Sequence, residues 1–218
     1  MRAILAACLL CLSAAAFAGQ LSVYSPDLAV MLAGANSPAF ADFSLAAQPR
    51  DNAKELKWNQ LAAQQGQAFA QYNLGTMYQQ GLGVPVNYTK AVKWLRLAAD
   101  HGFALAQAKL GGMYELGQGV PQDYAKALKW NRLAAQQGNS IAQVNLGFAY
   151  GEGQGAPQNY VAAYKWNETA KGATKPASKT YKVASENMAI LSRTMTTAQI
   201  AQAQQEASAW RAVHHKGS

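Results

Sequence analysis

The sequence predicts an all-α fold: a solenoid of helix–turn–helix repeats with a period of 36 residues, followed by a C-terminal capping helical hairpin. The first observation is a segment that recurs three times with small changes, as "GLGVPVNYTKAVKWLRLAADHG", "GQGVPQDYAKALKWNRLAAQQG" and "GQGAPQNYVAAYKWNETAKG". The second is that apolar residues inside each unit recur every three or four positions, as on one face of a helix. A fixed period of roughly 20 to 50 residues is typical of solenoids, whose units bury their apolar faces against neighbouring units.

The first helix of each unit has a narrow apolar stripe. In the first full unit, Ala70, Leu74 and Tyr78 are four residues apart and therefore share one helical face. A glycine at one position of this helix recurs with the period, at Gly75, Gly111 and Gly147. Glycine inside a helix costs about 1 kcal/mol relative to alanine, so its recurrence predicts a close crossing with the second helix. Gly81 and Gly83 then provide the freedom for a reversal.

The second helix has clear start and stop residues. An Asn or Asp, which caps free backbone N–H groups, opens it at Asp51, Asn87, Asp123 and Asn159. Tyrosines (Tyr88, Tyr124, Tyr160) and tryptophans follow at core spacing, and we expect both to fill the core. The tryptophans, expected to be structural, are Trp58, Trp94, Trp130 and Trp166. Gly66, Gly102 and Gly138 fall where a left-handed residue ends a helix.

The period also predicts the boundaries. Residues 50–67 form a half repeat, and full repeats span 68–103, 104–139 and 140–173. Residues 174–218 hold the two capping helices and a basic tail; in the second of these helices Thr196 and Gln199 form a capping box. Residues 19–49 are interpreted as a leader and a degenerate first helix. The leader is either a short helix begun by Ser25-Pro26 or a mobile segment.

The first eighteen residues, "MRAILAACLLCLSAAAFA", are typical of a signal peptide. Arg2 precedes an apolar run that ends in a small-x-small motif, Ala16-Phe17-Ala18. We therefore expect cleavage after about Ala18 and a periplasmic or secreted protein. The segment is shorter than the roughly 20 apolar residues of a membrane span, and no transmembrane segment is expected after its removal.

Removal of this segment changes the composition. Both cysteines lie within it, so the remaining chain has neither disulfide nor thiolate. The whole chain has a net charge of +8, and loss of Arg2 leaves +7. In an exported protein this balance favours acidic partners or anionic surfaces over nucleic acid, and no nucleic acid is expected.

The repeated motif carries a family resemblance. "A-x-A-Q-x-x-L-G-x-x-Y-x-x-G-x-G-x-P-x-(N/D)-Y-x-x-A-x-K-W" resembles the Sel-one-like repeat, a relative of the tetratricopeptide repeat, over roughly residues 50 to 173. The resemblance implies a right-handed α-solenoid whose first helices line a concave face, and a bacterial adaptor that holds other proteins. One branch of the family pairs cysteines in each repeat and is linked to penicillin binding. This chain lacks those cysteines after residue 18, so that function is not transferred.

Catalytic and metal sites are not indicated by the residues. A hydrolase needs a nucleophile, a base and a group that orients the base. The histidines are His101, which aligns with Gln65 and Gln137, and the pair His214-His215 beside the C-terminus. His101 is interpreted as a surface residue near a helix end, and the His214-His215 pair has no carboxylate close in sequence. A metal site needs converging ligands. We therefore expect no enzyme activity, no cofactor and no metal.

Two sets of residues are candidates for binding. On the first helices, positions that differ between repeats are not dictated by packing, and they form the predicted partner site: Tyr72, Asn73, Thr76, Lys109, Asn145 and Phe148. On the second helices, lysines recur beside the tryptophans and one turn earlier, which predicts a basic stripe: Lys54, Lys57, Lys90, Lys93, Lys126, Lys129 and Lys165. A solvated face that keeps an alanine-rich solenoid soluble is the simpler interpretation of that stripe.

The favoured function is therefore a non-catalytic, exported adaptor that binds a protein partner through the concave face. One alternative is a binder of anionic glycan or lipid through the lysine rows, whose binding would weaken with salt. The other is an envelope hydrolase of peptidoglycan or β-lactam, for which turnover would have to be observed.

Overall fold

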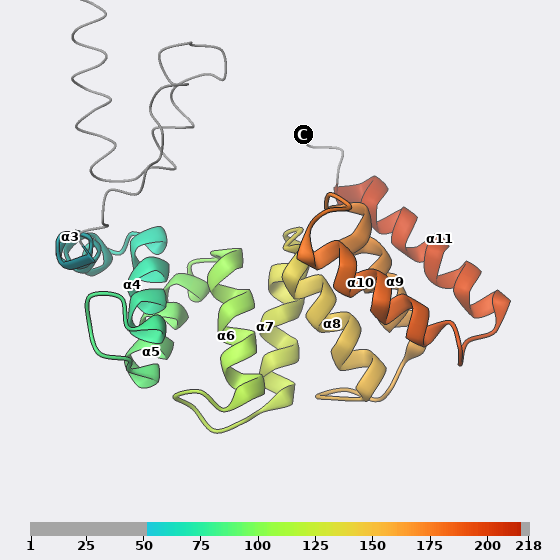
Figure 1. Ribbon diagram of the computed structural model, residues 1–218, viewed down its shortest axis with the longest axis horizontal. Helices are drawn as coiled ribbons and strands as arrows, with labels where there is room; N and C mark the ends of the chain where they lie inside the picture. The colour runs from blue at the N-terminus through green and yellow to red at the C-terminus, as the bar shows by residue number, and fades with distance from the viewer. Residues whose placement is uncertain (1–51, 215–218) are drawn as a thin grey trace, which may run out of the picture. The chain divides into compact units, whose positions relative to one another are not determined.

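The computed structural model describes residues 52–214, and these residues form nine α-helices and no strand (Figure 1). The helices are α3 (Asn52–Gln64), α4 (Ala68–Gln80), α5 (Tyr88–Asp100), α6 (Ala104–Leu116), α7 (Tyr124–Gln136), α8 (Ser140–Glu152), α9 (Tyr160–Gly172), α10 (Lys179–Leu191) and α11 (Thr197–His214). The chain divides into two compact units, residues 1–55 and 56–218, and the packing below is that of the second. The predicted signal peptide and leader lie outside the described residues.

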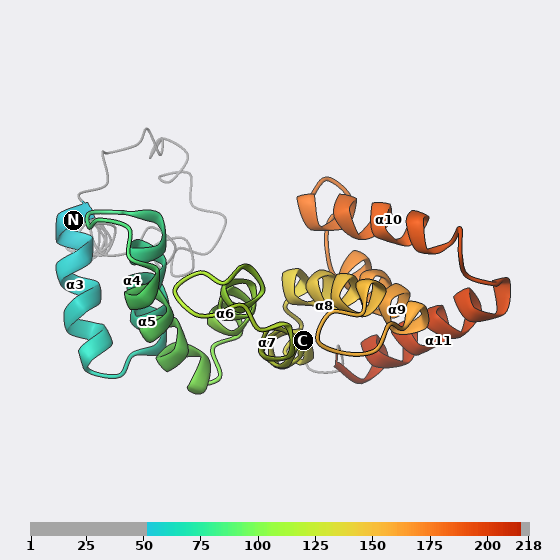
Figure 2. The same ribbon diagram turned by 90° about the horizontal axis from the view of Figure 1, so that it is seen from below.

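The helices pair as the period predicts. Within each repeat the first helix packs on the second, as α4 on α5, α6 on α7 and α8 on α9. The second helix of one repeat also packs on the first helix of the next, so the pairs follow one another in chain order (Figure 2). Equivalent helices begin 36 residues apart, at Ala68, Ala104 and Ser140. The predicted helical-repeat fold is thereby confirmed.

The helix ends use the residues that the sequence singles out. The side-chain oxygens of Asn87, Asp123 and Asn159 each accept a backbone N–H at 2.9 Å from the residue three positions later. The C-terminal glycines of the second helices, Gly102 and Gly138, have φ of 82° and 84°, a left-handed conformation that other residues adopt only with strain. These local stops place every hairpin in the same register.

The glycine inside each first helix marks a close crossing. A Cβ built on Gly75 would lie 2.7 Å from Cγ of Leu95, and one built on Gly111 would lie 2.9 Å from the Asn131 amide. Both distances are too short for a real carbon contact. The predicted crossing with the second helix is therefore confirmed, and residues 95, 131 and 167 are the groups that occupy the glycine notch.

The core is more aliphatic than predicted. Its fully buried apolar residues are mostly alanines and one leucine per first helix, Leu74, Leu110 and Leu146, joined by Leu95 and Met113. The expectation that the second-helix aromatics fill the core is wrong for Tyr88 and Tyr124, which are 40% and 37% exposed. These tyrosines open their helices, where the loop of the next repeat, at Gly119 and Gly155, packs against their backbone. The tryptophans are partly buried, or exposed in the case of Trp58, and three of them pack at the edges of aliphatic clusters: Trp94, Trp130 and Trp166.

A ladder of buried glutamines links successive repeats. Gln71, Gln107 and Gln143 each donate from Nε2 to a backbone carbonyl eight residues earlier, at 3.1–3.3 Å. The Oε1 of Gln107 accepts from Gln137 at 2.8 Å, and the Oε1 of Gln71 lies 3.2 Å from His101 Nδ1. His101 is exposed, as predicted, and takes the place of a glutamine in this ladder.

The last two helices do not form the expected hairpin. Helix α10 packs on α8 and α9, whereas α11 packs on α9 from another side, so α9 lies between them (Figure 2). The reason is that both apolar stripes face α9: Met188 and Ala203 share a cluster with Tyr164. The predicted capping box at the start of α11 is confirmed, since Thr196 N donates to Gln199 Oε1 at 2.9 Å and Gln199 N to Thr196 Oγ1 at 3.3 Å.

Candidate functional site

The first helices present one exposed stripe in the same register. Three residues at the second position of α4, α6 and α8 are apolar and exposed: Phe69, Leu105 and Ile141. Phe148, two turns after Ile141, and Leu116, three turns after Leu105, lie on the same helix face and are also exposed. We call this set (Phe69, Leu105, Leu116, Ile141 and Phe148) the first-helix surface. Sequence reasoning missed the three in-register residues because it chose positions that change in chemical character between repeats, and these three are apolar in every repeat.

Two of the predicted partner-site residues meet beside this surface. Lys109 Nζ on α6 donates to Gln79 Oε1 on α4 at 3.1 Å and lies 5.9 Å from the centre of the Tyr72 ring. Tyr72 itself packs on Phe103 with ring centres 5.3 Å apart. Burial lowers the pKa of Lys109, because the ammonium loses hydration without gaining a carboxylate. Lys109 is therefore a partly buried cation held by neutral groups.

The remaining predicted residues have different roles. Asn145 turns inward and donates from Nδ2 to Oδ1 of buried Asn131 at 3.2 Å, so it belongs to the packing between α7 and α8. The Thr76 hydroxyl is also buried. Asn73 is partly buried, while Phe148 is 45% exposed. The structure thus keeps Phe148 and Lys109 accessible and makes Asn145 a structural residue.

Glu115 is a site residue that the sequence reasoning did not identify. It lines a shallow depression between α6, α7 and α8 together with Tyr124, Asn131, Phe148 and Gln154. The cavity volume is about 10 Å³, which is room for roughly one water and not for a cofactor. Burial raises the pKa of Glu115. In the described part of the chain, neither Glu115 nor Lys109 has an oppositely charged side chain within ion-pair distance.

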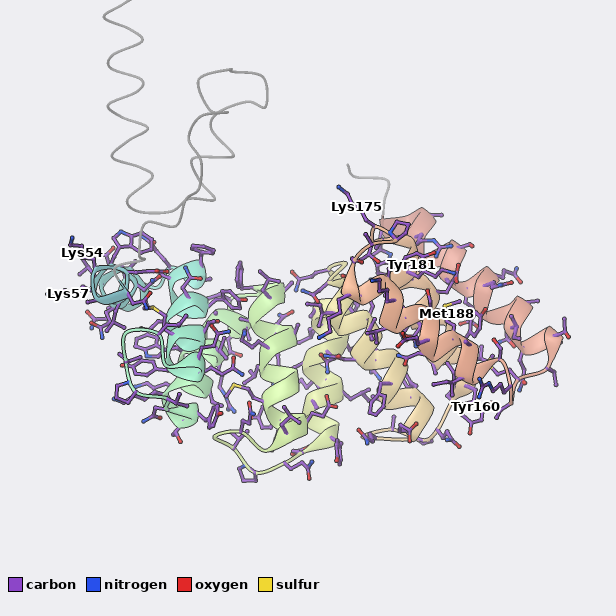
Figure 3. All side chains as sticks on the ribbon, in the orientation of Figure 1. Lys54, Lys57, Tyr160, Lys175, Tyr181 and Met188 are labelled. Carbon is purple, nitrogen blue, oxygen red and sulfur yellow. The ribbon has the colours of Figure 1, made fainter. Side chains whose placement is uncertain are left out.

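The lysine stripe is only partly free. Lys57, Lys93 and Lys129 are exposed, and Figure 3 shows Lys57 projecting from α3 away from α4. By contrast, Lys126 pairs with Asp123 at 2.8 Å. Lys165 is partly buried and lies 3.5 Å from Glu206 of α11, so the stripe is interrupted where α11 packs on α9.

The rest of the stripe has local neighbours. Lys90 lies 5.2 Å from the centre of the Tyr78 ring, and Lys54, although exposed, also has an interaction partner. Lys57, Lys93 and Lys129 are therefore the row that remains available to a ligand.

The histidines of the described residues contact neutral groups and belong to no metal-binding cluster. No group of three or more His, Cys, Asp or Glu side chains in residues 52–214 lies close enough to hold a metal ion. His101 contacts an amide oxygen, and His214 Nδ1 lies 2.8 Å from the Trp210 carbonyl while its ring stacks on Trp210. His215 lies outside the described residues. None of the helices between residues 52 and 214 is long and apolar enough to cross a membrane.

Helix pairs that repeat every 36 residues define a helical repeat protein. Residues 68–103, 104–139 and 140–170 match the Sel1 repeat. A Sel1 repeat protein from Oxalobacter formigenes is 34% identical, with a TM-score of 0.53, and the alignment covers 61% of this chain and 98% of that one. The chain belongs to the Sel1 repeat family, whose members generally mediate protein–protein interaction and are typically non-catalytic scaffolds.

A second solved structure is similar over more of this chain. It is c5321, described as a protective antigen present in uropathogenic Escherichia coli strains and displaying the same repeat fold. It is 28% identical with a TM-score of 0.56, and the alignment covers 88% of this chain and 45% of that one. This chain therefore spans less than half the length of that protein. No curated protein sequence matches it.

Proposed function

We propose that this protein is an exported, non-catalytic adaptor that holds a protein partner on the first-helix surface. The observation that carries the proposal is the row of exposed apolar side chains in register on α4, α6 and α8. Leu105 and Ile141 are 44% and 55% exposed, although other apolar residues of the same two helices are completely buried. Apolar anchors beside a charge, here Lys109, are typical of the centres of protein interfaces.

Site-specific photo-crosslinking tests the surface. A photoreactive phenylalanine analogue is placed at Leu105 or Ile141, and at Ile190 of α10 as a control that is equally apolar and 61% exposed. We expect one protein to be crosslinked from positions 105 and 141 and not from 190. Leu105→Ser/Ile141→Ser in the full chain should release that protein, whereas Ile190→Ser should not. Equal crosslinking from all three positions would contradict the proposed surface.

Export is a separate part of the proposal and rests on residues 1–18. Cell fractionation and N-terminal sequencing test it: we expect the protein outside the cytoplasm, beginning at about Gly19. A cytoplasmic protein that retains Met1 would refute export and leave the adaptor role intact.

The exposed row Lys57, Lys93 and Lys129 supports a second candidate, binding of anionic glycan or lipid. Such binding to exposed charges should weaken steeply as salt is raised. Charge reversal of these three lysines should abolish vesicle or polysaccharide binding without affecting crosslinks from Leu105.

A further inference from the structure

Two equivalent junctions between repeats have opposite charges. The junction between α4 and α6 contains Gln79 and Lys109, and 36 residues later the junction between α6 and α8 contains Glu115 and Asn145. In the first junction the long side chain of Lys109 reaches Gln79 at 3.1 Å. In the second junction, the position equivalent to Gln79 is the carboxylate Glu115, and the position equivalent to Lys109 is too short to reach it.

The residue in the glycine notch explains why Asn145 turns away. Position 95 is a leucine, which cannot hydrogen-bond Lys109, and the equivalent position 131 is an asparagine. Asn131 accepts a hydrogen bond from Asn145 at 3.2 Å and holds it against α7. Glu115 has no such lysine and instead lines the small depression that it shares with Phe148 and Gln154.

The surroundings of Glu115 suit a cationic side chain. The carboxylate is partly buried and, among residues 52–214, has no cation within ion-pair distance. Tyr124 and Phe148 line the same depression, and aromatic rings attract ammonium and guanidinium groups and cover their aliphatic stems. The depression opens beside Phe148 on the first-helix surface, where the partner is proposed to lie.

We propose that a lysine or arginine of the protein partner lies across the mouth of this depression with its charged group against Glu115, as Lys109 lies against Gln79 in the preceding junction. This inference rests on the proposed adaptor function and specifies the partner chemistry. The partner segment brings a basic residue to Glu115 and apolar residues to Phe148 and Ile141. The basic charge of the whole chain does not oppose this, because the attraction is local and partly desolvated.

Selection from a random peptide library displayed on phage tests the inference with the full chain as bait. We expect the enriched peptides to share a lysine or arginine. Synthetic versions are then measured by calorimetry against Glu115→Gln, which should lower their affinity about tenfold or more, as expected when one partner of a desolvated charge pair is lost. Glu152→Gln, which removes an exposed carboxylate from α8, is the matched control and should leave the affinity unchanged.

A second variant supplies the cation from within the chain. Asn131→Leu/Asn145→Lys copies the Leu95 and Lys109 pair into the second junction and should place an ammonium group beside Glu115. We expect the peptides to lose binding, and the pKa of Glu115, followed by NMR, to fall. Should this variant fail to fold, Glu115→Gln decides alone.

The outcomes separate the two proposals. Enriched peptides without a shared basic residue, affinities unchanged by Glu115→Gln, or no enrichment at all would each overturn the Glu115 inference. The adaptor function is judged independently, by the crosslinks from Leu105 and Ile141.

Discussion

Gly111 of α6 lies against Asn131 of α7 so closely that a single added carbon at Gly111 would stand 2.9 Å from the asparagine amide. The next residue, Gly112, has open space at the same position, with nothing within 4 Å. The close crossing therefore requires a glycine at position 111, whereas the surroundings of Gly112 leave room for a side chain.

We predict that Gly111→Ala and Gly112→Ala change stability in opposite directions. Gly112→Ala should raise the free energy of unfolding by about 0.5–1 kcal/mol, because alanine loses less backbone entropy in a helix. Gly111→Ala should lower it, because the added methyl group displaces Asn131 and overpacks the crossing. Urea unfolding of both variants gives the comparison, and equal effects would contradict the close crossing.

The glutamine ladder predicts a stabilising substitution. Gln143 Oε1 is buried and has no hydrogen-bond donor among the described residues, since Ala173 stands where Gln137 donates in the preceding repeat. The backbone of Ala173 (φ −91°, ψ −3°) resembles that of Gln137 (φ −87°, ψ 9°). Ala173→Gln should therefore add about 0.5–1.5 kcal/mol to the free energy of unfolding through the new hydrogen bond.

Thermal unfolding of Ala173→Gln measures this gain. The control is Ala173→Gln combined with Gln143→Leu, in which the acceptor is gone and the gain should disappear. A gain that persists in the double variant would show that the glutamine acts through helix propensity alone.

Asp123 should make the start of α7 pH-dependent. Side-chain and backbone hydrogen bonds from Lys126 hold the pKa of Asp123 below its ordinary value. Its contribution to stability is therefore complete above the pKa of the unfolded chain and is lost as pH falls through the lower folded pKa. Asp123→Asn, which copies the neutral cap at Asn87, should remove this acid-side dependence in thermal scans across pH. Asn87→Ala should cost about 1 kcal/mol at any pH because it removes the cap.

Glu115 should have the opposite dependence. Burial raises its pKa above the ordinary 4.5, so the folded chain binds this proton more tightly than the unfolded chain does. The resulting stability is present below the unfolded pKa and is lost as pH rises through the raised folded pKa. Glu115→Gln should thus raise the unfolding temperature at neutral pH and leave it unchanged well below pH 4.5, as measured by calorimetry. A lower unfolding temperature at neutral pH would mean that the carboxylate has a stabilising partner.

The local pattern of this chain was readable from the sequence because its causes are local. A cap such as Asn87 acts on a backbone N–H three residues away, and a stop such as Gly102 needs only its own φ. Because the pattern repeats every 36 residues, the same local rules apply in each repeat. The helix pairs and their register could therefore be predicted from Trp94, Trp130 and their neighbours. The order of the helices and the family resemblance follow from this same repeated pattern.

What the tertiary structure alone decided is how side chains meet between helices. Lys109 and Gln79 are thirty residues apart, and no periodicity says that they touch. The sequence places Asn145 among the candidate binding residues, but in the structure it donates a hydrogen bond to Asn131. Likewise, α10 and α11 each pack on α9 and not on each other. The physical reason is that the distance between helices, which no single helix encodes, and the reach of the side chains together determine which charged groups are paired. Glu115 is one that has no cationic partner among the described residues.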